Sequence, residues 1–351
     1  MPVVENYCSH LEELNVPLTK LTFQLKNSHF DNERLEKFGG EIEILERRLS
    51  ISWFSKLIKL CRGHSVLLCH GFNGTILAVL VKIFVPIRVI STYHGEYHPN
   101  GRLAGLKRLV IRALYLFSLK YVVDDIVTVE SYSKFQLIQK GVSGRKIKII
   151  YNAIDVRRTK FKASNKVKDL LDIIPNFDRV ILSVCRLDKV KGLRYALSAL
   201  ANLDENVSWL YLIAGNGPEE KTLKRFANKL GVEDRVVFLG YIPNPEPLYD
   251  ISDIFLLPSE FEYHSISILE AMRAGKTIIS TSVGGTPESV KSGKEGILVQ
   301  HSSVEELLNA LNQVCLDKDF AERLALNARN KFAKAFTLEL QRDKISELIF
   351  K

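Results

Sequence analysis

Residues 258–290 read PSEFEYHSISILEAMRAGKTIISTSVGGTPESV, and their helix and strand signals indicate the architecture of this part of the chain. Two carboxylates, Glu262 and Glu270, flank an apolar run that predicts a helix opening near Ser265. Gly275 ends this helix as a C-cap residue, and a β-branched strand follows directly. A helix that feeds at once into such a strand is typical of an α/β domain.

The start of this predicted helix also indicates a ligand. Backbone N–H groups at a helix N-terminus lack partners and carry partial positive charge, so Ser265, Ile266 and Ser267 favour an anion such as a diphosphate. Carboxylates close to that anion would repel it. Their use is therefore to accept hydrogen bonds from sugar hydroxyls. A phosphate cradle beside hydroxyl acceptors describes a nucleotide-sugar site.

A second group of charges supports the same ligand. Arg186 and Lys191 lie in SVCRLDKVKG, directly after a predicted strand and before a helix. Two cations and a helix N-terminus can stabilise the negative charge of a departing nucleoside diphosphate without a metal. Arginine suits bidentate phosphate contact and lysine supplies a point charge. The alternative is a solvated basic loop, since Lys189 and Arg194 are close in sequence.

Apolar runs alternate with amphipathic segments along all 351 residues, which predicts parallel βαβ units in two domains. Expected strands are residues 21–25, 41–45, 66–69, 88–92, 126–129 and 147–150, then 180–184, 209–214, 236–239, 254–257, 277–280 and 296–299. Expected helices are residues 53–62, 74–84, 105–120, 132–140, 193–202, 219–230, 266–274, 304–315, 320–332 and 338–350.

The opening stretch resembles the E-x7-E signature of retaining glycosyltransferases of the GT-B fold, in particular glycosyltransferase family 4. That signature usually reads P-S-x-x-E-G-F-G-x-x-x-x-E-A-M-A-x-G-x-P-V. The matching residues are Pro258, Ser259, Glu262, Glu270, Ala271, Met272 and Gly275. The departures are Tyr263 and Ser265 in place of glycines and Lys276-Thr277 in place of x-Pro, so we expect Tyr263 and His264 to crowd the donor-sugar loop.

The resemblance implies an α/β chain of the GT-B fold, with two Rossmann-like domains facing across a cleft. We expect an acceptor-side domain at residues 1–155 and a nucleotide-sugar-binding domain at 169–335. A polar, lysine-rich linker separates them, and residues 336–351 form a helix that crosses back to the first domain. Because residues 4–14 read as a helix, the first strand and its glycine loop are expected to be missing.

The resemblance also implies roles for single residues. Arg186 and Lys191 hold the donor diphosphate, Glu270 accepts hydrogen bonds from the ribose, and Glu262 lies near the donor sugar. Transfer with retention is written as a same-face attack in which a phosphate oxygen takes the proton. Glu262 is therefore not assigned the role of base.

Weaker landmarks complete the expected site. Gly215, Asn216 and Gly217 form a glycine turn beside the donor cleft, although such turns after strands are common. Tyr241, in LGYIP, resembles the segment that reads the nucleotide base, or it is a core residue. His94 ends a predicted strand in the first half, where it faces acceptor and transferred sugar or is an ordinary turn histidine.

Charge and composition indicate which partners and which cellular compartment suit the chain. Residues 1–160 contain 24 Lys and Arg against 14 Asp and Glu, while the rest of the chain is close to neutral. The basic half suits anionic lipid or a phosphorylated acceptor, and no nucleic-acid-binding pattern is present. Residues 101–119 are basic and apolar, so this segment either lies on a membrane surface or is an ordinary domain helix. Five scattered cysteines indicate a reduced cytoplasmic protein, and we expect neither metal nor cofactor.

The sequence therefore predicts a cytoplasmic, peripheral-membrane retaining glycosyltransferase. Its donor would be a UDP- or GDP-sugar, and its acceptor a glycan or lipid-linked glycan in surface polysaccharide assembly, such as capsule or lipopolysaccharide. One alternative is a nucleotide-sugar epimerase of the same fold. A second is a truncated paralogue that binds without transferring. An oxidoreductase is disfavoured because no G-x-G-x-x-G follows a strand.

Overall fold

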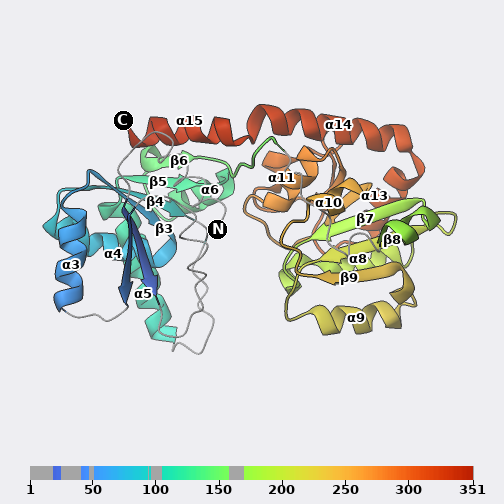
Figure 1. Ribbon diagram of the computed structural model, residues 1–351, viewed down its shortest axis with the longest axis horizontal. Helices are drawn as coiled ribbons and strands as arrows, with labels where there is room; N and C mark the ends of the chain where they lie inside the picture. Colours follow the sequence, from blue (N-terminus) through green and yellow to red (C-terminus); the bar gives the residue numbers. More distant parts are fainter. Residues whose placement is uncertain are drawn as a thin grey trace. The chain divides into compact units, whose positions relative to one another are not determined.

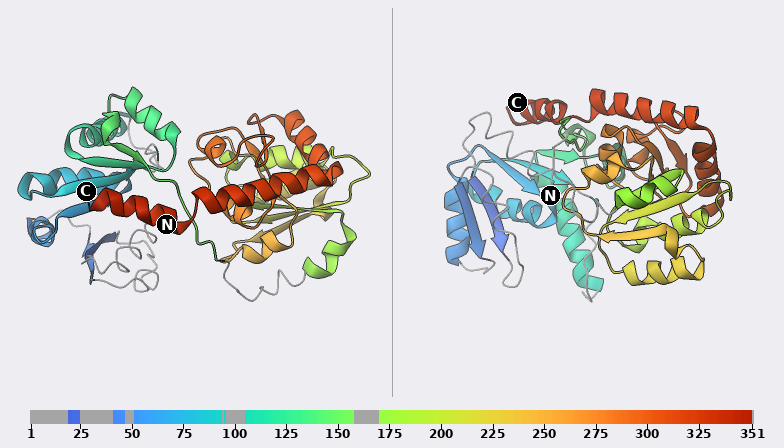
Figure 2. Two further views of the ribbon diagram at one scale, coloured as in Figure 1. Left: turned by 90° about the horizontal axis from the view of Figure 1, so that it is seen from above. Right: turned by 45° about the vertical axis from the view of Figure 1, so that its right-hand side comes forward.

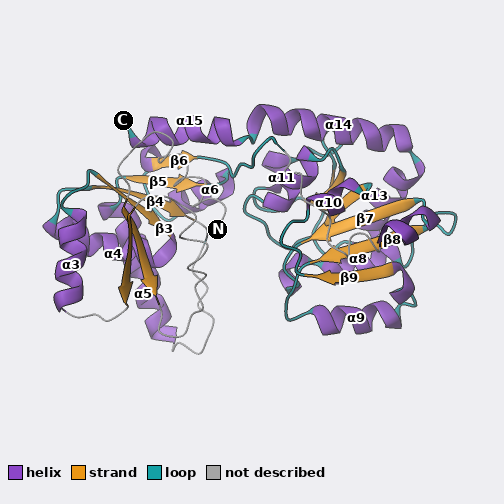
Figure 3. Cartoon of the chain, viewed as in Figure 1, coloured by secondary structure: helices purple, strands orange, loops and turns teal. Residues whose placement is uncertain are grey.

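The computed structural model describes residues 19–24, 41–46, 51–93, 95, 105–157 and 170–350. Helices and strands alternate along most of these ranges, and three helices follow the last strand (Figure 3). They form two compact units: a first unit up to Tyr151 that also includes residues from Glu339 onward, and a second unit from Asn152 to Leu338. Figure 1 labels helices and strands of both. The expected helix at residues 4–14 and most of the expected linker lie outside the described residues.

The second unit is built on a six-stranded parallel sheet. In spatial order its strands are β12 (Ile297–Val299), β11 (Thr277–Thr281), β10 (Ile254–Leu257), β7 (Arg179–Val184), β8 (Trp209–Ala214) and β9 (Val236–Gly240). The chain runs outward from β7 to β9, returns to β10 on the other side of β7, and continues to β12. This is the Rossmann strand order, with its switch point between β7 and β10. There Ile254 is in register with Ile181.

Helices lie on both sides of this sheet, as Figure 2 shows. They are α8 (Leu193–Leu200), α9 (Glu220–Lys229), α10 (Glu246–Asp250), α11 (Ile266–Arg273), α12 (Thr286–Ser289), α13 (Val304–Leu316) and α14 (Lys318–Ala335). Strands covered on both faces are mainly apolar, and every residue of β8, β10 and β11 is buried, including the small polar residues Thr277, Ser280 and Thr281 of β11. The rigid core therefore leaves the loops at the strand ends to carry the site.

The first unit contains a four-stranded parallel sheet in the order β3 (Val66–His70), β4 (Arg88–Tyr93), β5 (Asp125–Thr128) and β6 (Ile147–Ile149). Its helices are α3 (Ile51–Cys61), α4 (Gly71–Phe84), α5 (Gly105–Phe117), α6 (Ser131–Gln139) and α15 (Leu338–Ile349). On α15, Ile345 and Leu348 are buried against Ile90, Val127 and Ile150 of the sheet region. The end of the chain thus completes the core of the first unit.

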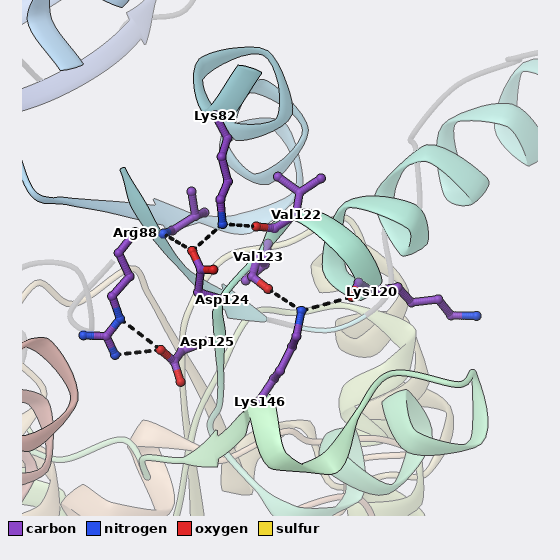
Figure 4. A network of polar contacts seen from close by, with 9 residues as sticks. Lys82, Arg88, Lys120, Val122, Val123, Asp124, Asp125 and Lys146 are labelled. Atoms are coloured by element: carbon purple, nitrogen blue, oxygen red, sulfur yellow. Dashed lines mark hydrogen bonds and ion pairs between the residues drawn. The ribbon is translucent and has the colours of Figure 1, made fainter. Parts of the chain in front are cut away.

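In both sheets an aspartate accepts hydrogen bonds at the amino-terminal ends of the strands. Asp124 Oδ2 accepts hydrogen bonds from the Lys82 ammonium at 2.5 Å and the Val89 N–H at 2.8 Å (Figure 4). These bonds hold the pKa of Asp124 below its usual value, against the desolvation that raises it. In the second unit Asp253 Oδ2 accepts from Val180 N–H at 2.8 Å in the same way. These amino-terminal ends lie opposite the carboxyl ends of the strands, where α/β sheets bind ligands.

The predicted α/β class is confirmed, with two differences in detail. The expected strands in residues 21–25 and 41–45 appear as β1 (Thr19–Gln24) and β2 (Glu41–Glu46). These two pair with each other in a separate two-stranded parallel sheet. The helix expected at residues 105–120 ends its regular part at Phe117 and continues as a π-helical turn, η1 (Ser118–Val122).

Candidate active site

Two loops meet at the switch point of the second unit. One follows β7 and carries Arg186 and Lys191; the other follows β10 and carries Ser259 and Glu262. Because β7 and β10 are parallel neighbours, their carboxyl ends open on the same edge of the sheet. The fold therefore brings together residues that lie far apart in the sequence.

Glycines allow these loops to touch. Gly192 has a φ of +66°, and a Cβ built there would lie 1.9 Å from the carbonyl oxygen of Pro258. Gly284 has a φ of +50°, and its Cβ would lie 1.8 Å from the carbonyl oxygen of Glu262. A side chain at either position would separate backbones that are in direct contact. The loop geometry of the site therefore depends on both glycines.

Lys191 and Glu262 form an ion pair across these loops. The lysine Nζ lies 2.6 Å from Glu262 Oε1, and the side chains are 21% and 9% exposed. The Ser259 hydroxyl donates to the same oxygen at 2.7 Å. The sequence assigned the lysine to the diphosphate and the glutamate to the sugar, and the structure holds the two together.

Arg186 lies on the open side of the same loop. Its side chain is 77% exposed, and its Nε lies 2.8 Å from Asp188 Oδ2. An exposed guanidinium is accessible to a ligand, and its planar group can bind phosphate through two N–H donors. Asp188 was not singled out in the sequence, and it reduces the positive charge of this loop.

The helix predicted within residues 258–290 is α11, and its N-cap is Ser265. The Ser265 hydroxyl lies 3.1 Å from the hydroxyl of Ser267. The first-turn N–H groups, including those of Ile266 and Ser267, cannot bond within the helix. They are directed out of the start of α11, which follows the loop that carries Glu262. Gly275 ends the helix in the left-handed conformation, with a φ of +65°.

Glu270 lies one turn further along α11 and is half-buried. Its Oε2 accepts a hydrogen bond from the Tyr249 hydroxyl at 2.8 Å. Burial raises the pKa of Glu270, while the Tyr249 hydrogen bond and the Arg273 charge oppose that rise. Tyr249 lies on α10 and carried no recognisable signal in the sequence.

The glycine turn and Tyr241 lie at the same edge of the sheet, after β8 and β9. Gly215 has a φ of +143°, and a Cβ there would lie 1.8 Å from the Cys185 carbonyl oxygen. The Leu187 N–H donates to the backbone carbonyl oxygen of Asn216 at 2.9 Å, and this bond connects the turn to the loop that carries Arg186. A Cβ on Gly217 would lie 2.4 Å from Leu187. Tyr241 is 62% exposed, so the interpretation that it is a core residue is wrong.

The sequence led to predictions for His94 and His264, and the structure describes only the second of these histidines. His94 lies outside the described residues, so its proposed position toward the acceptor stays a prediction. His264 does not crowd the donor-sugar loop, because it is only 3% exposed. Its Nε2 lies 3.1 Å from the Ser289 hydroxyl, and its ring packs edge-on against Phe336. Burial and the Lys331 charge lower the pKa of His264 to about 3.

The described residues offer neither a cluster of metal ligands nor a membrane-spanning helix. Within the described ranges, no group of three or more His, Cys, Asp or Glu side chains is arranged to hold a metal ion. The expected independence from metal stays a prediction. In the same ranges no helix combines the length and hydropathy that a membrane span requires.

The chain matches two glycosyltransferase family models. The model for glycosyl transferases group 1 matches residues 173–331, and that for glycosyltransferase family 4 matches residues 3–158. The two models together span most of the chain. Glycosyl transfer is the chemistry that defines both.

Curated relatives include transferases that use different acceptors. The chain is 29% identical over 292 residues to N-acetyl-alpha-D-glucosaminyl L-malate synthase of Bacillus anthracis, a match covering 81% of this chain and 74% of the relative. It is 28% identical over 285 residues to UDP-Gal:alpha-D-GlcNAc-diphosphoundecaprenol alpha-1,3-galactosyltransferase of Escherichia coli, covering 79% and 72% respectively.

A solved structure shares the fold. The crystal structure of Anabaena Alr3699/HepE in complex with UDP has a TM-score of 0.84 and 20% sequence identity, covering 99% of this chain and 95% of that one. A crystal structure of the same protein with UDP-glucose has a TM-score of 0.81, 19% identity and coverage of 99% and 94%. The chain belongs to glycosyltransferase family 4, the glycosyl transferases of group 1, and it has the GT-B fold.

Proposed function

We propose that this chain transfers a sugar, with retention of anomeric configuration, from a UDP- or GDP-sugar to a glycan or lipid-linked glycan. The observation that carries the proposal is the gathering of Arg186, Lys191, Glu262 and the start of α11 at one switch point. Two cations and a helix N-terminus suit a diphosphate, and the carboxylates suit hydroxyl groups.

The diphosphate would lie against Arg186, Lys191 and the first turn of α11. Charge on the β-phosphate grows as the bond to the sugar breaks, and fixed positive groups lower the energy of that transition state. Lys191 is already oriented by its bond to Glu262. The lysine would therefore need little rearrangement to stabilise the leaving group.

The two carboxylates would divide the hydroxyl groups between them. Glu270 is held by Tyr249 at one oxygen and would accept from the ribose. Glu262 lies one loop away, bonded to Lys191 and Ser259 through Oε1, and would use Oε2 for a sugar hydroxyl. A site that pairs with specific hydroxyls rejects analogues that lack them.

Transfer would proceed on one face of the donor sugar. The acceptor oxygen forms a bond to the anomeric carbon as the bond from that carbon to the diphosphate oxygen breaks. The proton of the acceptor hydroxyl passes to an oxygen of the departing phosphate. No step requires an enzyme carboxylate as nucleophile or a metal ion, and the anomeric configuration is retained.

Calorimetric titration with UDP and with GDP tests the donor site directly. We expect wild type to bind one of them, and Arg186→Ala and Glu270→Ala to weaken that binding by at least about tenfold. Arg225→Ala, an exposed arginine on α9 outside the site, is the matched control. A folded wild type that binds neither nucleotide would overturn the proposal.

Product analysis separates the reaction classes. Incubation of a UDP-sugar with a lipid-linked glycan should give a product whose anomeric proton coupling matches that of the donor. Conversion of the donor sugar without any acceptor would favour the epimerase. Nucleotide binding with no transfer to any acceptor would favour a non-catalytic paralogue.

The acceptor assignment is the part of the proposal supported by relatives. The Escherichia coli relative bears a name in which the acceptor is a diphosphoundecaprenol-linked sugar. On α5 and η1 of this chain, Val110, Leu114, Phe117 and Tyr121 follow helical spacing and are each about half exposed or more. Such an exposed apolar stripe suits the surface of a membrane. We propose peripheral association with anionic lipid at the cytoplasmic face, in surface polysaccharide assembly.

Vesicle sedimentation tests this association. Wild type should sediment with vesicles containing phosphatidylglycerol, and Phe117→Ser with Tyr121→Ser should reduce the bound fraction several-fold. Phe135→Ser, which alters an exposed phenylalanine on α6, is the control. Equal binding by wild type and the double variant would exclude the stripe as the contact.

A further inference from the structure

Tyr249 connects α10 to the carboxylate proposed to bind the ribose. Its hydroxyl lies 2.8 Å from Glu270 Oε2 and 3.2 Å from the Ser267 carbonyl oxygen. Its ring is 1% exposed and packs against Phe255, with centroids 5.8 Å apart. A side chain this deeply buried cannot touch a nucleotide. Any effect of Tyr249 on a ligand must therefore pass through Glu270.

The two oxygens of Glu270 have different surroundings. Oε2 accepts from Tyr249, whereas Oε1 accepts no hydrogen bond from any residue that the structure describes. Glu270 is half-buried, and Oε1 is not among the fully buried polar atoms without a partner in the described residues, so this oxygen is accessible. A carboxylate held at one oxygen has lost most of its rotational freedom about the last side-chain bond. Its second oxygen then points in a defined direction.

The charges around Glu270 come from α10 and α11. Burial and the nearby Glu246 carboxylate raise the pKa of Glu270, while the Tyr249 hydroxyl and the Arg273 guanidinium lower it. Arg273 is itself paired with Glu246 at 2.5 Å. The tyrosine is thus the direct hydrogen-bond donor that favours the ionised form, and only the ionised carboxylate accepts at both oxygens.

We infer that Tyr249 is a positioning residue of the nucleotide site, which holds one oxygen of Glu270 and so directs the other toward the ribose hydroxyls. This inference rests on the proposed nucleotide-sugar function. It assigns to α10 a role in selecting ribonucleotides over nucleotides that lack those hydroxyls.

Titration with UDP and 2′,3′-dideoxyuridine diphosphate tests the role. Wild type should prefer UDP by about tenfold or more, because a hydrogen bond to a charged group contributes to that preference. Tyr249→Phe should reduce the preference to about threefold or less and leave the affinity for the dideoxy compound nearly unchanged. If GDP is the better ligand, the guanosine pair replaces the uridine pair.

Tyr211 supplies the matched control. It is another fully buried tyrosine of the second unit, and its hydroxyl lies 2.7 Å from Ser183 instead of a site carboxylate. Tyr211→Phe should keep the wild-type preference. If Tyr249→Phe also keeps it, or loses affinity for both nucleotides equally, the inference is wrong. If wild type binds UDP without preferring it over the dideoxy compound, the ribose role proposed for Glu270 is wrong, and the inference about Tyr249 is wrong with it.

A second variant avoids removing the hydroxyl. Replacing Tyr249 with 3,5-difluorotyrosine strengthens the phenol as a donor with little change in shape. The preference is the ratio of the affinities for UDP and for the dideoxy compound, and it should decline as the pH falls and Glu270 takes up a proton. Titration of the phosphates cancels in this ratio, because both compounds carry the same diphosphate. The midpoint should move to lower pH with difluorotyrosine and to higher pH with Tyr249→Phe. An unmoved midpoint in both would overturn the inference.

Discussion

The ammonium of Lys191 lies 2.6 Å from a carboxylate oxygen of Glu262, although the two residues are 71 positions apart. Both side chains are largely buried, and the Ser259 hydroxyl donates to the same oxygen. The pair combines the cation proposed for the diphosphate with the carboxylate proposed for the sugar. A ligand at this site would therefore meet a lysine whose charge is already partly balanced.

Removing the carboxylate should separate binding from transfer. Glu262→Gln keeps the side-chain shape but leaves Lys191 unbalanced, so UDP binding should tighten by about three- to tenfold. Transfer should fall by about 100-fold or more, because the contact with the donor sugar weakens. Calorimetry and a transfer assay measure the two effects. Glu260→Gln, an exposed neighbour in the same loop, should change neither, and weaker UDP binding by Glu262→Gln would contradict the account.

Close packing of the loops can be tested with two glycines of similar backbone conformation. Gly192 and Gly231 have φ values of +66° and +69°, but a Cβ on Gly231 would meet nothing within 4 Å. Gly231→Ala should cost about 1 kcal/mol from backbone strain alone. Gly192→Ala should cost at least about 2 kcal/mol more, because its Cβ would overlap the Pro258 carbonyl.

Urea unfolding monitored by circular dichroism gives the comparison, and Gly192→Ala should also impair transfer because the Lys191 loop must move. Similar costs for the two alanine variants would show that the contact with Pro258 is unimportant.

Acid should destabilise the second unit through His264. Burial lowers the pKa of this histidine to about 3, whereas an unfolded histidine titrates near about 6.5. Below pH 6.5 the unfolded chain binds a proton that the folded chain does not. Stability is therefore complete above pH 6.5 and falls toward pH 3, by about 2 kcal/mol at pH 5.

Urea unfolding between pH 8 and pH 5 measures this loss. His264→Gln should flatten the pH dependence, even if the variant is less stable at pH 8. His301→Gln alters an exposed histidine and should leave the dependence as in wild type. An unchanged slope in His264→Gln would mean that other groups cause the acid sensitivity.

The pair between Arg273 and Glu246 should be costly to break from one side. Their side chains are about one-tenth exposed, and the guanidinium lies 2.5 Å from Glu246 Oε1. Glu246→Ala leaves a buried cation unbalanced and should cost about 3 kcal/mol or more. Adding Arg273→Met should recover part of that loss. The exposed pair Lys224–Glu220 is the control, with an expected coupling below about 0.5 kcal/mol.

A double-mutant cycle measured by urea unfolding gives the coupling energy of each pair. Equal coupling in the buried and the exposed pair would show that burial of the Arg273 side chain contributes little.

Local patterns predicted most elements because their signals extend over only a few residues. The strand expected at residues 254–257 appears as Ile254–Leu257, and the helix beginning beside Ser265 has that serine as its N-cap. Gly275 adopts the left-handed conformation expected after this helix. Each of these outcomes depends on side-chain period or backbone freedom, which can be read from neighbouring residues.

Contacts between distant segments could not be read in this way. Tyr249 has no local feature that marks it as a partner of Glu270, and its position follows from the packing of α10 against α11. His264 was expected to crowd the donor-sugar loop, yet it turns inward to Ser289 and Phe336. Tyr241, for which the sequence allowed burial, is mostly exposed.

The sequence by itself determined the order of strands and helices, the glycosyltransferase signature and the residue types that can bind a nucleotide sugar. Tertiary structure decided which charges balance one another: Lys191 with Glu262, Arg186 with Asp188, and Arg273 with Glu246. The physical reason is that periodicity acts within a segment, whereas the strength of a charge depends on partners and burial that only the folded sheet supplies.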